Sequence, residues 1–132
     1  MRICTDIEVL QETDNVRTLL KDMLHGRNRI TILVGCFGDL PKEQEVLSHL
    51  DELGIKKGIH YTYLMRIPGF LPQQIAIGYA LYCRDMQVDM FFAKDDLTIS
   101  QVNLQSPLTT CFLMRRFSEK SNEALMNLAP KK

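Results

Sequence analysis

Residues 29–93 contain three short apolar runs: 30–34 (ITILV), 61–67 (YTYLMRI) and 88–93 (VDMFFA). Two stretches in which apolar residues recur at helical spacing separate these runs. Alternation of strand and helix is typical of βαβ units, whose parallel strands form one sheet. The sequence therefore predicts an α/β fold.

The rest of the chain adds elements on either side of this segment. Helices are predicted at 16–24, 41–54, 72–86 and 118–128, and a fourth strand at 108–114. Residues 1–12 fit neither period and leave open an edge strand or a loose arm, and residues 97–104 alternate too weakly to decide whether they form a strand. We expect 1–132 to be one three-layer domain, with a mostly parallel four-stranded sheet, helices on both faces and a flavodoxin-like or thioredoxin-like order.

The predicted helix 72–86 is apolar around almost its whole circumference. A helix of this kind is buried on more than one face, and one sheet covers only one of them. Either a terminal helix or another subunit must cover the rest, and we expect a protein partner or a homo-oligomer. The candidate partner-binding residues on this helix are Ile75, Ile77, Tyr79 and Tyr82. Two further candidates, Arg115 and Arg116, form a separate basic patch.

Charge and composition exclude several classes of function. Sixteen basic residues balance sixteen acidic ones, so the positive field that draws proteins to nucleic acid is missing. Acidic residues interrupt the N-terminal segment, and no apolar run approaches the ~18 residues of a membrane span. Cys4, Cys36, Cys83 and Cys111 are singly spaced, without a C-x-x-C pair. We expect a cytoplasmic protein without membrane contact, whose cysteines are small apolar core residues.

Ligand sites of open parallel sheets lie at the carboxyl ends of the strands. The catalytic candidate there is Cys36, which lies between the end of a predicted strand and the start of a predicted helix, where the helix dipole lowers the pKa of a thiol. The candidate ligand-binding residues are Phe37, Gly38, Pro68, Gly69 and Phe70. Neither G-x-G-x-x-G nor the P-loop pattern occurs in the chain.

Metal ligands are also sparse. Asp95 and Asp96 follow the third strand and could bind magnesium, but an acidic pair in a loop is more often solvated surface. His25, His49 and His60 lack the spacing of metal ligands. We expect no metal and no cofactor.

One local pattern resembles a known family. The strand at 30–34, the aromatic Phe37 past its end, a helix stopped by Gly54 and a strand running into Arg66-Ile67-Pro68-Gly69-Phe70 resemble the first half of lumazine synthases. In that family the aromatic residue stacks on a pyrimidine ring and the subunits pack into rings. The resemblance covers about residues 30–128 and implies the α/β fold and ring packing.

The reaction of that family does not carry over. Its glycine-threonine phosphate site and catalytic histidine have no counterpart here, because 94–106 is short and no histidine follows His60. The glutamate after the Pro-Gly turn is replaced by Leu71-Pro72-Gln73. Thioredoxin-like folds have a similar order of elements, but their C-x-x-C is absent, so a redox function does not transfer either.

Two functions follow as hypotheses. The first is a non-catalytic protein that acts through protein–protein association, as an adaptor, regulator or immunity-type binder. The alternative is a small-molecule-binding or lumazine-synthase-like enzyme with its site at the carboxyl ends of the strands.

Overall fold

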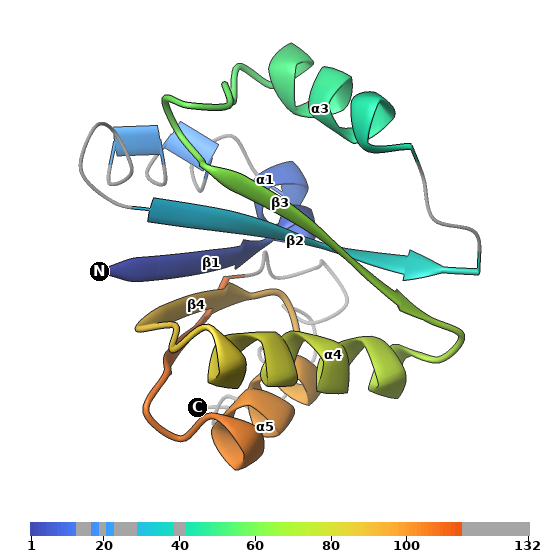
Figure 1. The fold of residues 1–132 in the computed structure, drawn as a ribbon, viewed down its shortest axis with the longest axis vertical. Coiled ribbons are helices and arrows are strands. Elements are labelled where there is room, and N and C mark those ends of the chain that lie inside the picture. The colour runs from blue at the N-terminus through green and yellow to red at the C-terminus, as the bar shows by residue number, and fades with distance from the viewer. Residues whose placement is uncertain (13–16, 19–20, 23–28, 39–41, 115–132) are drawn as a thin grey trace, which may run out of the picture.

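The computed structural model describes residues 1–12, 17–18, 21–22, 29–38 and 42–114 (Figure 1). The strands are β1 (Arg2–Asp6), β2 (Arg29–Phe37), β3 (Tyr63–Gly69), β4 (Met90–Ala93) and β5 (Thr110–Leu113). The helices are α1 (Ile7–Glu12), α3 (Glu43–Glu52), α4 (Pro72–Asp85) and α5 (Asp96–Gln105). Of the helix expected at 16–24, residues 17–18 and 21–22 are described and are helical. The helix expected at 118–128 lies outside the described residues.

The five strands form one parallel sheet in the order β3-β2-β1-β4-β5. The predicted α/β fold is confirmed, with five strands in place of four. The added strand is β1, which pairs with both β2 and β4 at the centre of the sheet, so residues 2–6 are neither an edge strand nor a loose arm. The first three strands of the chain lie side by side in the spatial order β3-β2-β1, whereas in a flavodoxin-like sheet they would lie in the order β2-β1-β3.

Burial on both faces explains why β1 was hard to recognise. Ile3, Cys4, Thr5 and Asp6 are all buried. A strand covered on both sides lacks the alternation of apolar and polar residues that marks a half-exposed strand. Its sequence therefore shows no clear period.

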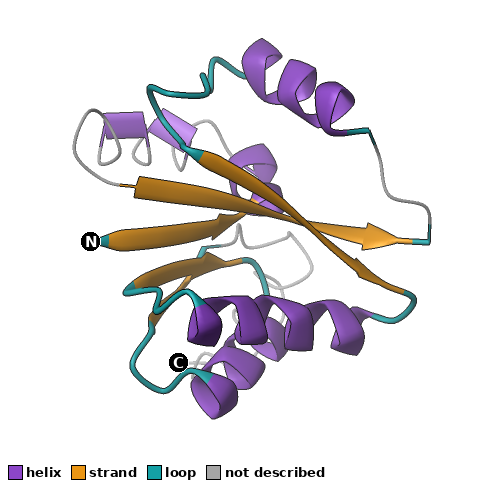
Figure 2. Cartoon of the chain, in the orientation of Figure 1, coloured by secondary structure: helices purple, strands orange, loops and turns teal. Residues whose placement is uncertain are grey.

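The helices cover both faces of the sheet, α3 on one side and α4 with α5 on the other (Figures 1 and 2). Neighbouring strand residues point to opposite faces. Ile32 belongs to the cluster that includes Val46 and Leu50 of α3, whereas Leu33 packs with Ile75 of α4. Two apolar layers thus enclose the sheet.

Contacts within the chain account for the apolar circumference of α4. One face of α4 packs on the sheet and another on α5, so no second subunit is needed to cover it. Gly78 lets α4 approach β3 closely, because a Cβ there would collide with the Cγ2 atom of Ile67.

The weakly alternating segment after β4 is helical, not a strand. Asp95 is the N-cap of α5, and its Oδ1 accepts a hydrogen bond of 2.8 Å from the backbone N–H of Thr98. This cap satisfies one of the N–H groups that a helix start leaves unpaired. Val102 of α5 is buried in the same cluster as α4. Among the described helices, none is long and apolar enough to cross a membrane.

Candidate functional site

A cavity of about 220 Å³ lies at the carboxyl ends of the central strands. Its polar side chains come from Asp6, Glu8, Gln11, Tyr79, Asp95 and Thr98. Its remaining wall is formed by Ile7, Gly35, Pro72 and Ile75. Helix α1, which follows β1, packs in the cluster on the α3 face of the sheet, whereas α5, which follows β4, packs with α4 on the other face. The order of strands in the sheet therefore reverses its direction between β1 and β4. Ligands of open α/β sheets bind at this switch point.

Asp6 is the last residue of β1 and is only 4% exposed. Its Oδ1 accepts a hydrogen bond of 3.0 Å from the backbone N–H of Glu8. Burial raises the pKa of Asp6 from 3.8 to about 7. The N–H of Glu8 opposes this rise, the charges of Glu8 and Asp95 add to it, and Lys94 opposes it. Near neutral pH this carboxyl is therefore present in both protonation states.

The groups around Asp6 make the cavity acidic. Glu8 follows it at the start of α1, and Asp95 stands at the start of α5. The Nζ of Lys94 lies 3.6 Å from Oε2 of Glu8, with both side chains more than a third exposed. Such an exposed ion pair is held loosely.

Tyr79 supplies a buried hydroxyl on the α4 side. Its ring packs against Phe91 with centroids 6.0 Å apart. Burial, followed by the charge of Asp6, raises the pKa of Tyr79, so the hydroxyl stays protonated. A Cβ on Gly35 would lie 2.8 Å from Cγ2 of Ile75 and 2.9 Å from the hydroxyl of Tyr79. The glycine thus lets α4 reach the cavity.

Cys36 does not have the setting of a reactive thiol. It is buried, and its Sγ donates a hydrogen bond of 3.4 Å to the carbonyl of Val34. Burial raises the pKa of Cys36, and the opposing charge of Arg66 does not cancel this effect. Helix α3 begins only at Glu43, so its N-terminus is not adjacent to the thiol.

The expected ligand residues lie beside the cavity and do not line it. Gly38 donates its N–H to the carbonyl of Gly69 at 3.3 Å, which joins the ends of β2 and β3. Pro68 and Phe70 are exposed, Phe70 to 81%. Phe37 ends β2, and its side chain is not among those described.

Two of the expected partner-binding residues are not available to a partner. Ile75 and Tyr79 are buried against the sheet. Ile77 and Tyr82 are half-buried, and the hydroxyl of Tyr82 donates to Oγ1 of Thr31 at 3.1 Å. Arg115 and Arg116 lie outside the described residues.

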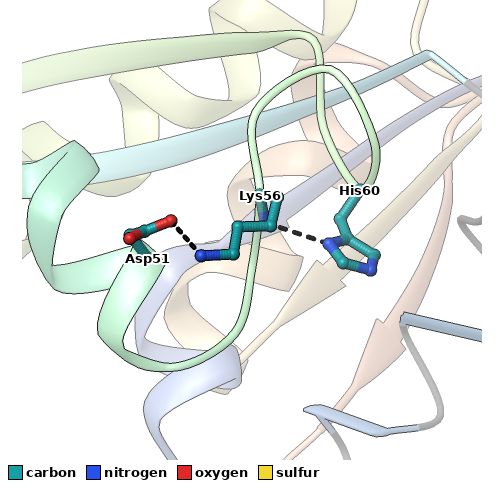
Figure 3. Close-up of polar contacts among 3 residues, drawn as sticks. All are labelled: Asp51, Lys56 and His60. Atoms are coloured by element: carbon teal, nitrogen blue, oxygen red, sulfur yellow. Dashed lines mark hydrogen bonds and ion pairs between the residues drawn. The ribbon is translucent and has the colours of Figure 1, made fainter.

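His60 lies in the connection between α3 and β3 and is hydrogen-bonded within it (Figure 3). Its Nδ1 accepts a hydrogen bond of 2.9 Å from the backbone N–H of Lys56, and the Nζ of Lys56 lies 2.5 Å from Oδ1 of Asp51. Within the described ranges, no group of three or more His, Cys, Asp or Glu side chains is arranged to hold a metal ion.

Asp6 and Glu8 were not among the predicted site residues. Sequence offers one signal for Asp6, an acid that ends an apolar run, but this signal depends on recognising residues 2–6 as a strand. Asp95 was considered for magnesium, and the structure places it at the same cavity as Asp6. No protein-family model and no curated protein matches the chain.

Proposed function

We propose that this protein binds a small molecule in the switch-point cavity and transfers a proton to or from it at Asp6. This is the second of the two functions that the sequence suggests, moved to a different set of residues. The observation that carries it is a carboxyl that is 4% exposed, borders a cavity and has a pKa of about 7. Strongly perturbed carboxyls in clefts are concentrated at functional sites.

The chemistry assigned to Asp6 is general acid–base catalysis. A group of this kind works best when its pKa lies near the working pH, because it then holds and releases a proton with equal ease. Tyr79 stays protonated and supplies a hydroxyl group to the same cavity. Ile7, Pro72 and Ile75 provide apolar contact for the rest of the ligand.

A thermal-shift screen tests this proposal. Neutral, anionic and cationic metabolites, flavin precursors and nucleotides among them, are added to the wild type and to Asp6→Asn. We expect at least one ligand to raise the melting temperature of the wild type and to lose most of that effect in Asp6→Asn. The proposal fails if no class of ligand shifts the wild type, or if every shift is unchanged in the variant.

We propose protein association as a second function because of the apolar side chains along β3. Strand β3 is an edge of the sheet, with Tyr63 57% exposed and Met65 also exposed, and the exposed Phe70 and Leu71 follow its end. Unpaired strand edges with apolar side chains favour pairing with another chain. Light scattering over a tenfold concentration range checks this: a constant monomer mass for the wild type would remove self-association.

The resemblance to lumazine synthases stays a prediction. The cavity is bordered by Asp6, Glu8 and Asp95, none of which belongs to the motifs that carry the resemblance. We also propose a cytoplasmic location, which the four free cysteines support, since free thiols persist in reducing compartments.

A further inference from the structure

We infer that Cys4 and Cys83 form a dithiol that a small peroxide oxidises to a disulfide joining β1 to α4. The inference stands apart from the proposed function, because neither thiol lines the switch-point cavity. It rests on a cluster of buried sulfurs and on a second cavity that reaches one of them.

The register of the strands places Cys4 under α4. Cys4 is in register with Phe91 of β4, and Phe91 is in register with Cys111 of β5. Residues in register on parallel strands point to the same face of a sheet, here the face that α4 covers. Cys83, in the last turn of α4, is buried in the same cluster, and its thiol is hydrogen-bonded to that of Cys4. The two sulfurs are therefore neighbours in the folded protein.

Cys111 is the competing partner, and the sheet keeps it away from Cys4. Two strand spacings separate β1 from β5, which puts roughly 10 Å between the Cα atoms of Cys4 and Cys111. The Cα atoms of a disulfide lie only about 4.4 to 6.8 Å apart. The thiol of Cys111 instead donates to the carbonyl of Thr109 at 4.0 Å. Cys83 is therefore the partner within reach of Cys4.

A cavity of about 110 Å³ gives a small molecule access to Cys4. It lies at the amino ends of the strands, and Cys4 lines it together with Tyr63, Tyr82 and Met86. Tyr63 and Met86 are exposed, so the cavity opens at the surface. One water takes up about 30 Å³ in the liquid, which leaves room here for hydrogen peroxide with its two oxygens. Cys83 does not belong to this wall, so the oxidant meets Cys4 first.

The two thiols have different roles. Cys83 donates its hydrogen bond to Cys4, and this contact, followed by burial and the charge of Cys4, raises the pKa of Cys83. A hydrogen bond made by the neutral form holds the proton on its donor. Since the thiolate is the nucleophilic form, Cys4 attacks the peroxide. Cys83 then closes the bridge.

The reaction proceeds in two steps. The sulfur of Cys4 attacks one oxygen of hydrogen peroxide, the O–O bond breaks, and the released hydroxide takes up the proton that Cys4 gave up. The sulfur of Cys83 then attacks the resulting sulfenic acid, the S–S bond forms, and the sulfenic hydroxyl leaves as water with the proton of Cys83. In total, two thiols lose two electrons and two protons, and one hydrogen peroxide becomes two molecules of water.

The disulfide fixes α4 on the central strand of the sheet. Cys4 and Cys83 are almost eighty residues apart in the chain, and a cross-link over so long a loop restricts the unfolded state strongly. We therefore expect the oxidised protein to melt roughly 5 to 15 °C above the reduced protein.

Peptide mapping after treatment with hydrogen peroxide tests the inference. The reduced wild type is oxidised in native buffer, unfolded in iodoacetamide to block the remaining thiols, and digested with trypsin without reductant. Cleavage after arginine and lysine places the four cysteines on four different peptides, so mass spectrometry identifies each linked pair. The same oxidation in urea, where any two cysteines can meet, is the reference. The variants are Cys4→Ala and Cys83→Ala, with Cys36→Ala as the control that removes a buried thiol outside this cluster.

We expect one linked pair, Cys4 with Cys83, in the wild type and in Cys36→Ala, and reversal by dithiothreitol. Cys83→Ala should stop at the sulfenic acid of Cys4, which dimedone traps, and Cys4→Ala should form no bridge. The inference is wrong if both thiols stay free to react with iodoacetamide, or if the main link in native buffer joins another pair or is no more frequent than in urea. A melting temperature that oxidation leaves unchanged or lowers would contradict a bridge between β1 and α4. If either variant fails to fold, the peptide map and the melting temperature of the wild type decide the question.

Discussion

Replacement of Asp6 by asparagine should stabilise the protein at alkaline pH. The folded state holds the proton of Asp6 up to a pKa of about 7, whereas the unfolded chain releases it near 3.8. Stability therefore falls as the pH rises through this window, because the folded state binds more protons than the unfolded state. At pH 8 the raised pKa lowers the free energy of unfolding by roughly 4 kcal/mol, and about 2.5 kcal/mol of this decrease occurs between pH 5 and pH 8.

Asparagine cannot titrate, but its Oδ1 still accepts the N–H of Glu8. We expect Asp6→Asn to be more stable than the wild type by roughly 2 to 4 kcal/mol at pH 8 and by less at pH 5, after allowance for the weaker neutral hydrogen bond. Urea unfolding followed by circular dichroism at both pH values measures this, with Glu52→Gln as control. Parallel pH profiles for the wild type and Asp6→Asn, or a variant that is weaker at pH 8, would refute the reasoning.

Three further predictions concern the scaffold around the site. Gly78→Ala should destabilise the protein by about 1 to 3 kcal/mol, since its Cβ meets Cγ2 of Ile67, and Ile67→Ala, which removes that atom, should cost less in the double variant than alone; strictly additive unfolding free energies would contradict the contact. Gln87→Gly should stabilise by about 1 kcal/mol, because Gln87 has φ 52° after the end of α4, and a lower urea midpoint would argue against strain there. Iodoacetamide near neutral pH should leave Cys36 unmodified in the folded protein and label it after denaturation, as mass spectrometry of peptides can show; rapid labelling of the folded protein would reopen Cys36 as a nucleophile.

Local chemistry was sufficient to predict the segments whose periodicity is strong. The helix after β2 was expected to stop at Gly54, and Gly54 follows the end of α3 with φ 78°. The positive φ is one that glycine adopts without strain, which is why it marks helix ends. Helix α4 was expected from Pro72 to Met86 and runs from Pro72 to Asp85.

Long-range pairing decided what the sequence left open. Residues 2–6 become the central strand because β2 and β4 flank them, and no pattern within five residues reveals such partners. Residues 96–105 form a helix whose sequence has little amphipathic period, since the cap at Asp95 and packing on α4 determine its structure. Helical propensity and period are weak guides where tertiary contacts dominate.

The site was missed for the same reason. Asp6 and Asp95 are almost ninety residues apart in the chain, and only the adjacency of β1 and β4 places both at one cavity. Cys36 was favoured because its strand was expected to lead directly into a helix. Helix α3 begins only at Glu43 and the thiol is buried, so a helix dipole does not lower its pKa.

The most direct test of the account is an NMR titration in which the chemical shift of the Asp6 side-chain carboxyl carbon is followed from pH 3 to pH 9. The account predicts a midpoint of about 7. A midpoint near the ordinary value of 3.8 would contradict the acid–base role of Asp6.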